Sequence, residues 1–468
     1  MKVSSKSPSI FSLLKLALRG DQQEFTDGSI NLAIFLLSVP MILEMAMEAL
    51  FAIADVFYVS RLNDNDALAT VVLTESMLTL VYSVAMGMGM GATALVARRT
   101  GEKNRAAAAH AGVQAIYLGL GVSLVIAVVG MLASDDLLRL MGADANVVAH
   151  YAGYTYWMLT GNVTIMMLFI VNGIFRGAGD ASAAMRALII ANGVNLVLDP
   201  LLIFGLGPVP AFGVEGAAIA TNIGRGLGVL YQIYYLSSAH SVIRIDARSL
   251  MPKSETIANL LKVSAGAIAQ FLIGSASWIF LVRIMAPFGS AALAGYTIAI
   301  RIIVFAILPS WGMANAAATL VGQNLGAGKA DRAERSVWRT GFINMLFLAA
   351  VTVVFLLFAQ DIVGLFTVDE EVLFHGKRCL QVVSAGYCFY AYGMVINQSF
   401  NGAGDTRTPT ILSFVGFWLF QVPFAYVMAK SLGFGPDGVY IAIVTAETAM
   451  AIAGILLFRM GKWKAVRV

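Results

Sequence analysis

Carboxyl and amide side chains occur inside apolar segments of this chain, where such groups are uncommon. Glu44, Glu48 and Asp55 lie in one such segment, and their spacings of four and seven residues place them near one face of a helix. Asn195 and Asp199, four residues apart in another segment, also share a helix face. An ionised group at the centre of a membrane costs about 2.5–3.5 kcal/mol on insertion scales, so each acid requires a partner or a function.

These residue types are suited to binding a small cation. Two carboxyls at one depth can share a proton, whereas carboxylate, amide and hydroxyl oxygens together can hold Na⁺. We therefore expect a proton or sodium site formed by Asp55, Asn195, Asp199 and Thr221, with Tyr154 beside it. The alternative is that these groups only satisfy each other's hydrogen bonds. It weighs more for Glu44 and Glu48, which we treat as auxiliary candidates.

Long apolar segments carry these residues. Of the 468 residues 59% are apolar and 12% are charged, whereas a soluble domain carries about 25% charged residues. This composition excludes a disordered chain and argues against a water-soluble enzyme. A transmembrane helix needs about 20 mainly apolar residues. Twelve segments meet that requirement, near 29–61, 67–97, 105–133, 146–176, 182–206, 214–238, 256–287, 290–322, 332–360, 371–402, 408–432 and 437–460.

The two halves of the chain repeat. Asn-Gly-Ile-Phe-Arg-Gly-Ala-Gly-Asp at 172–180 matches Asn-Gln-Ser-Phe-Asn-Gly-Ala-Gly-Asp at 397–405, and the same shift along the sequence, which we call the repeat offset, aligns Gly101 with Gly326. Six spans per half give both halves the same orientation, with a cavity between them. The predicted fold is therefore an all-α membrane protein of 12 transmembrane helices in two pseudo-symmetric six-helix bundles around a central cavity. We divide it into a tail or interfacial helix (1–28), an N-lobe (29–238), a cytoplasmic linker (239–255), a C-lobe (256–460) and a C-terminal tail (461–468).

The candidate cation site belongs to the first half. Helix direction and a rise of about 1.5 Å per residue place Asp55, Asp199, Thr221 and Tyr154 at one level in the outer half of the N-lobe. At the repeat offset, the two aspartates correspond to positions at or near phenylalanines. The notable polar groups of the second half are Gln270, Arg301 and Asn397. We expect Arg301 to be a structural partner for an acid or a carbonyl.

Pro40 lies fifteen residues before Asp55 in the first span. Because proline removes a helix hydrogen bond and clashes with the preceding turn, we expect a kink there. The kink is either a static packing feature or a hinge whose bend depends on the charge of Asp55.

Basic residues indicate the orientation. With a cytoplasmic N-terminus, 22 of the 31 Lys and Arg residues fall on the cytoplasmic side. Both termini should therefore be cytoplasmic in a plasma (inner) membrane.

The net charge of +4 is too small to suggest a nucleic-acid partner. The two Gly-Ala-Gly-Asp loops follow no strand and are expected to be tight turns with a helix-capping Asp, so we expect no nucleotide site and no cofactor other than the coupling ion.

Several segments taken together resemble the multidrug and toxic compound extrusion (MATE) family, over nearly the whole chain. The matching segments are Ala54-Asp55, Ala-Thr-Ala-Leu-Val-Ala-Arg-Arg-Thr-Gly (92–101), Arg-Gly-Ala-Gly-Asp (176–180), Asn-Leu-Val-Leu-Asp-Pro (195–200), Gly-Ala-Ala-Ile-Ala-Thr (216–221) and Leu-Val-Gly-Gln-Asn-Leu-Gly-Ala-Gly-Lys (320–329). The acid-poor seventh and tenth spans resemble the DinF-type branch of that family.

The resemblance implies an exporter and not an enzyme. Such a protein exchanges inward-moving H⁺ or Na⁺ for an organic, often cationic and amphiphilic, compound by alternating access. The family's cation-site positions correspond to Asp55, Asn195, Asp199 and Thr221, with Tyr154 and Asn172 as neighbours. Asn172 fits the estimated depth poorly, because it lies towards the cytoplasmic end of its span. The expected partners are small organic compounds and the lipid bilayer, and we expect a monomer.

Other functions remain open at this point. A lipid-linked oligosaccharide flippase of the same superfamily is the nearest competitor, and it would favour a cationic central cavity. An ion channel is a competitor from another class, but the two-half repeat has no filter-like loop. An intramembrane enzyme lacks HExxH, GxSxG and paired metal ligands.

Overall fold

The computed structural model describes residues 10–20, 24–238, 241–245 and 249–467. Within these residues all regular secondary structure is helical, apart from one isolated bridge between Leu206 and Val209. A short first helix, α1 (Ile10–Arg19), occupies part of the predicted tail, whose residues 1–9 and 21–23 lie outside the described residues. The all-α fold class is confirmed.

Seven helices form the N-lobe. They are α2 (Ile30–Ser60), α3 (Asn65–Gly101), α4 (Arg105–Leu140), α5 (Ala145–Thr160), α6 (Val163–Ala178), α7 (Ala181–Phe204) and α8 (Val214–Ser237). The C-lobe contains α9 (Ser254–Met285), α10 (Ser290–Gly326), α11 (Ala330–Gly364), α12 (Glu370–Ser384), α13 (Tyr387–Ala403), a span made of α14 (Arg407–Ser413) and α15 (Val422–Tyr426) with π-helical turns after each, and α16 (Pro436–Arg459). These helices follow the twelve predicted segments closely.

Two predicted spans differ from straight apolar helices. Among the described residues, ten helices are long and apolar enough to cross a membrane, or eleven when α12 and α13 count as one span. The twelfth, α8, is less apolar because it carries Glu215 and Arg225. The predicted span 371–402 is broken, because α12 and α13 are bent by 61° around Ala385 and Gly386.

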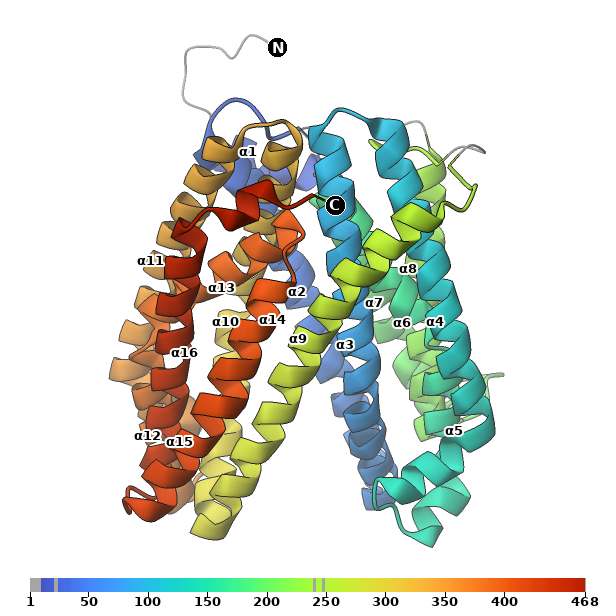
Figure 1. Cartoon of the computed structure of the whole chain (residues 1–468). Helices are drawn as coiled ribbons and strands as arrows, with labels where there is room; N and C mark the ends of the chain where they lie inside the picture. Colours follow the sequence, from blue (N-terminus) through green and yellow to red (C-terminus); the bar gives the residue numbers. More distant parts are fainter. Residues whose placement is uncertain (1–9, 21–23, 239–240, 246–248, 468) are drawn as a thin grey trace.

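The two lobes meet at one end of the bundle and diverge towards the other (Figure 1). Helix α1 and the C-terminal turn η4 (Lys462–Ala465) lie at the end where the lobes meet, which we call the closed side. There Arg98 of α3 donates hydrogen bonds to the carbonyls of Val466 (2.6 Å) and Ala403 (3.4 Å). We call the opposite end the open side.

Equivalent glycines let the lobes approach each other. A Cβ on Gly87 of α3 would lie 2.6 Å from the backbone N of Ile268 in α9, and a Cβ on Gly312 of α10 would lie 2.8 Å from the backbone N of Ile42 in α2. Gly312 corresponds to Gly87 at the repeat offset. The α3–α9 and α2–α10 contacts are therefore equivalent, as expected for two lobes related by an axis along the membrane normal.

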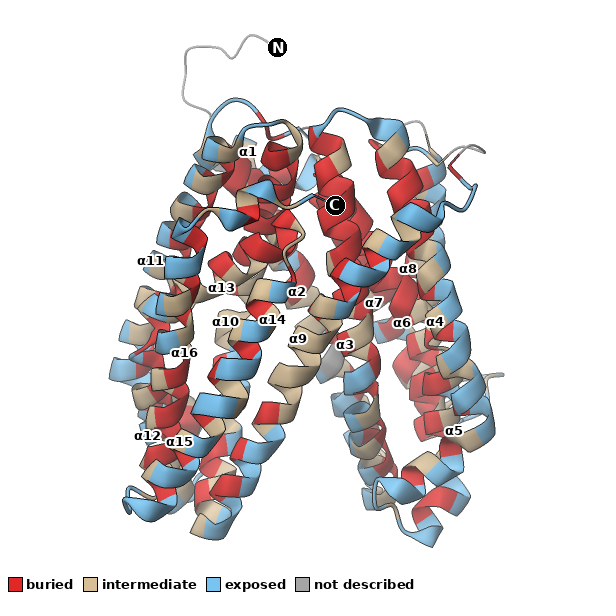
Figure 2. Ribbon diagram, in the orientation of Figure 1, coloured by how far each residue is buried: buried red, intermediate tan, exposed pale blue. Residues whose placement is uncertain are grey.

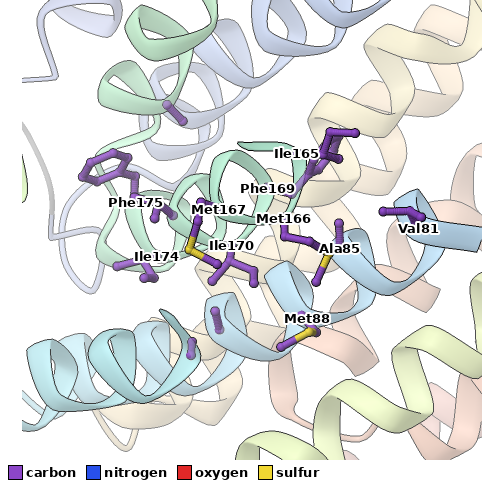
Figure 3. Packing of buried hydrophobic residues seen from close by; sticks show 14 of the residues in the cluster. Val81, Ala85, Met88, Ile165, Met166, Met167, Phe169, Ile170, Ile174 and Phe175 are labelled. Carbon is purple, nitrogen blue, oxygen red and sulfur yellow. The ribbon is translucent and has the colours of Figure 1, made fainter. Parts of the chain in front are cut away.

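Each lobe has its own apolar core. In the N-lobe the core includes Val81, Ala85 and Met88 of α3, which pack near Met166 and Ile170 of α6 (Figure 3). Many residues on the outer faces of both lobes are exposed (Figure 2). Large apolar residues are among the exposed ones, for example Leu132 of α4 and Leu357 of α11. A soluble protein seldom leaves so much apolar surface exposed, whereas a lipid bilayer covers it.

Candidate functional site

The groups predicted for the cation site lie together where α2, α7 and α8 meet. Thr221 of α8 donates its hydroxyl hydrogen to Asp55 Oδ2 of α2 at 3.3 Å. The Asn195 amide of α7 donates to Asp199 Oδ1 at 3.0 Å and to Thr221 Oγ1 at 3.5 Å. The Asp55 and Asp199 carboxyls are also within hydrogen-bonding reach of each other. We call these four residues the N-lobe acid site.

The N-lobe acid site is closed to solvent and incompletely satisfied. Asp199 is 0% exposed and Asp55 is 9% exposed. Asp55 Oδ1 and Asp199 Oδ2 are buried and accept no hydrogen bond from any described residue. Buried polar atoms without a partner are costly. One proton shared by the two carboxyls, or one cation between them, would satisfy both oxygens.

Helix packing explains how these residues meet. Asn195 and Asp199 are one turn apart, so both point from the same face of α7. Gly224 of α8 permits the close approach of α7, because a Cβ there would lie 2.7 Å from the Ala191 carbonyl oxygen and 3.1 Å from the Asn195 Cβ. A larger residue at 224 would move Thr221 away from Asn195.

Tyr154 lies next to the N-lobe acid site. It belongs to α5, is 3% exposed, and lies close enough to Asp55 and Asp199 to interact with both electrostatically. Within the described part of the chain its hydroxyl forms no hydrogen bond to either carboxyl, so it borders the site and does not complete it.

Arg225 is a neighbour that sequence analysis missed. It is 2% exposed and lies one turn after Thr221 on α8. Its Nη2 lies 3.8 Å from Glu48 Oε2, and its guanidinium stacks over Phe51 at 4.6 Å and Tyr82 at 5.4 Å. The available signal was a lone arginine inside an apolar segment. Glu48 is therefore paired with a cation between the N-lobe acid site and the closed side.

Asn172 does not join the N-lobe acid site, which corrects the prediction that it is a neighbour of that site. Its amide donates to Glu44 Oε1 at 3.1 Å, and its own oxygen accepts from Gln232 at 2.7 Å. Glu44 also forms a 2.9 Å ion pair with Arg176. Glu44 precedes Asp55 by eleven residues on α2, which is about 16 Å along a helix. Asn172 and Glu44 thus form a separate network nearer the closed side.

The remaining candidates lie apart from both networks. Helix α2 continues through Pro40 without a break. Gln270 of α9 accepts a hydrogen bond from Asn401 at 3.2 Å, within the C-lobe. Arg301 of α10 is exposed and makes no hydrogen bond or close ion pair with a described residue. It interacts electrostatically at longer range with an acid, Glu75 of α3 in the other lobe, so its structural role stays a prediction.

A central pocket lies between the lobes. Residues of α2, α3 and α6 line it on one side and residues of α9, α10 and α13 on the other. Methionines and aromatic rings dominate the lining, including Met45, Met86, Met90, Phe271 and Trp311. Flexible, polarizable methionines can adapt to ligands of different shape. Arg176, which also lines the pocket, is neutralised by Glu44.

Comparison with known proteins relates this arrangement to one family. A family model described as MatE matches residues 40–201 and 267–427, one segment in each lobe. The probable multidrug resistance protein NorM of Thermotoga maritima is 25% identical over 431 residues, 92% of each chain.

Two solved structures share the fold over almost the full length. The crystal structure of a MATE protein in complex with MaL6 is 29% identical, with a TM-score of 0.88 over 98% of this chain and 100% of that one. A MOP superfamily transporter from Pyrococcus furiosus is also 29% identical, with a TM-score of 0.87 over 99% of this chain and 100% of that one. The latter is described as having a binding pocket of reverse polarity that suggests a different function.

Proposed function

This chain belongs to the MatE family of multidrug and toxic compound extrusion transporters, and on that basis we propose that it is a secondary active antiporter. It exports organic, often cationic and amphiphilic, compounds in exchange for H⁺ or Na⁺. The observation that carries this proposal is the N-lobe acid site, where two buried carboxyls each keep one oxygen without a hydrogen-bond donor among the described residues. An ion that enters and leaves such a site changes its charge and its hydrogen bonding.

The donors around the carboxyls favour a proton as the coupling ion. Thr221 and Asn195 both donate towards the carboxyls, so Asp55 Oδ1 and Asp199 Oδ2 supply the free lone pairs. Two lone pairs suffice for a shared proton. Sodium needs more oxygen ligands, which requires the Asn195 amide to turn its oxygen towards the ion. Na⁺ therefore remains the alternative coupling ion at the same four residues.

Helix α2 provides the link between the ion and the lobes. It carries Asp55 in the N-lobe acid site, packs against α10 of the other lobe at Ile42, and contains Pro40 two residues before that contact. Neutralising Asp55 weakens its attraction for Thr221 and for Arg225. Helix α2 can then bend at Pro40, where the proline removes one helix hydrogen bond. Coupling follows if the ion binds the two orientations of the lobes with different affinity.

The orientation in the cell is part of the proposal. The closed side, with α1 and η4, faces the cytoplasm of a plasma (inner) membrane, and the open side faces outward. Leu14 and Leu18 of α1 are exposed beside Lys15, as in a helix that lies in the membrane interface. The transporter acts as a monomer, and no cofactor other than the coupling ion takes part.

Transport in proteoliposomes tests the proposal. Accumulation of the fluorescent cation ethidium should depend on an imposed pH or sodium gradient in wild-type protein, and Asp55→Asn and Asp199→Asn should each abolish that dependence. Asp136→Asn, which changes an exposed acid at the end of α4, is the matched control and should transport normally. Gradient-dependent ethidium transport by Asp55→Asn protein would refute the coupling role. Translocation of a lipid-linked oligosaccharide without ethidium transport would instead establish a flippase.

A further inference from the structure

The C-lobe also contains an acid inside a membrane-spanning helix. Glu447 lies at the middle of α16 and lines a partly open pocket. The same pocket is lined by Trp278 of α9, Val304 of α10, and Tyr387 and Tyr390 of α13. No described residue donates a hydrogen bond to the Glu447 carboxyl or pairs with it. An acid at this depth without a partner calls for a functional explanation.

The N-lobe shows what a structural residue does at the equivalent position. Glu447 corresponds to Asn222 of α8 at the repeat offset. Asn222 bridges the break between α5 and α6 by two hydrogen bonds. Its amide donates to the Trp157 carbonyl at 2.8 Å, and its oxygen accepts from Thr164 at 3.2 Å. The break between α12 and α13 is at the equivalent place, since Gly386 corresponds to Gly161 at the same offset.

Glu447 does not perform that structural role. The pair α12–α13 is bent by 61°, and the pocket opens beside the bend, with Gly386 and Tyr387 in its lining. The Tyr387 hydroxyl is buried and has no partner among the described residues. At the C-lobe position the acid Glu447 replaces the amide of Asn222. The two hydrogen bonds across the helix break have no counterpart there among the described residues, and a pocket lies beside the break. Discontinuous membrane helices are common places for substrate sites.

The lining indicates which ligand fits. Trp278, Tyr387 and Tyr390 present aromatic rings, which attract organic cations through their faces. Glu447 can supply a single negative charge when it is ionised, and aliphatic side chains such as Val304 and Ile307 complete the lining. This combination suits a monovalent organic cation with an apolar body better than a bare metal ion, which needs several oxygen ligands.

The C-lobe pocket adjoins the central pocket. Trp311 of α10 lines the central pocket, and its indole N–H is within hydrogen-bonding reach of the Tyr390 hydroxyl in the C-lobe pocket. Trp311 and Tyr390 therefore separate the two pockets at this point.

We propose that the Glu447 pocket is a substrate subsite that binds the cationic group of an organic amphiphile, with the carboxylate as counter-charge and Trp278, Tyr387 and Tyr390 as its aromatic wall. This inference rests on the proposed export function, and it assigns substrate binding to the C-lobe and ion coupling to the N-lobe. The two carboxyl sites thus serve different ligands.

Equilibrium binding of tetraphenylphosphonium to the full chain in lipid nanodiscs tests this assignment. Glu447→Gln should weaken binding of the cation by about tenfold or more, equivalent to roughly 1.4 kcal/mol. Uncharged triphenylphosphine oxide should bind with unchanged affinity, because the apolar walls remain. Glu255→Gln, at the exposed start of α9, is the matched control and should bind both probes like the wild type.

Two further comparisons separate the outcomes. Equal tetraphenylphosphonium affinity in Glu447→Gln and Glu255→Gln would overturn the subsite even if Asp199→Asn had lost ion-driven transport. Weakened binding in Glu447→Gln together with normal transport by Asp199→Asn would support the subsite and refute the coupling site. If Glu447→Gln melts below the control, Trp278→Leu replaces it. An unchanged affinity of Trp278→Leu for the cation would then overturn the proposal.

Discussion

The closed side depends on two glycines that cannot be enlarged without separating the lobes. Gly101 ends α3 and Gly326 ends α10, at equivalent positions of the repeat. A Cβ on Gly101 would lie 1.9 Å from the carbonyl oxygen of Gln323, and a Cβ on Gly326 would lie 2.1 Å from that of Arg98. Both obstacles are backbone atoms of the opposite lobe, so no side-chain rotation relieves them.

We predict that Gly101→Ala opens the closed side. The shortest contact that a Cβ accepts is about 3 Å, so the two helix ends must move apart by about 1 Å. Overpacking of this kind costs about 1–3 kcal/mol. The cost applies only while the lobes meet on this side. The substitution should therefore shift the equilibrium towards an orientation that is open on this side by about 5- to 150-fold, and Gly326→Ala should act in the same direction.

Distance measurements between spin labels at Lys103 and Arg335 test this prediction. Both positions are exposed on the closed side, one in each lobe. Gly101→Ala should add a population at longer distance that the wild type lacks. Gly121→Ala is the matched control, because a Cβ at that α4 position meets nothing within 4 Å. Identical distance distributions for the Gly101 and Gly121 variants would show that the glycine contact does not hold the lobes together.

Two predictions concern stability. Glu44→Leu leaves Arg176 and Asn172 facing an apolar side chain, and loss of one partner of a buried ion pair should destabilise the protein by about 3 kcal/mol; an unchanged melting temperature in nanodiscs would contradict it. Lys329 donates a hydrogen bond to Asp27 and lowers the pKa of that carboxyl below its usual 3.8. This ion pair stabilises the fold above pH 3.8 and loses its effect as the pH falls through the lowered pKa. The melting temperatures of wild type and Asp27→Asn should therefore differ near pH 7 and converge once the pH lies below that lowered pKa. A difference that persists at the lower pH would contradict that reasoning.

Local features of the chain were sufficient to predict the fold class. Apolar length identified the helices, because a membrane span depends on about 20 consecutive residues and not on distant ones. The internal repeat indicated two equivalent lobes. The Gly-Ala-Gly-Asp turns were also predictable, since Gly179 and Gly404 adopt φ 86° and Asp180 accepts a hydrogen bond from the Ala183 amide at the start of α7.

The depth of each residue along its helix was enough to predict part of the candidate site. Asp55, Asp199 and Thr221 were predicted at one level from their distance to helix ends, and the structure places them in hydrogen-bonding contact. Asn172 was assigned to the cation site only through the family resemblance. In the structure its amide instead donates a hydrogen bond to Glu44. Depth was the more reliable guide here, because rise along a helix is constant.

Partners across helices were decided by the tertiary structure. Whether Glu48 faces lipid or Arg225 depends on how α2 and α8 are rotated against each other, and a rotation of either helix leaves the sequence pattern unchanged. Likewise, Glu447 is recognisable as an unpaired acid only when the bend between α12 and α13 and the pocket beside it are known. Composition and spacing therefore determined the membrane fold and the depth of its acids. Helix rotation and helix breaks, which depend on packing between distant segments, decided which acids are neutralised and which can bind a ligand.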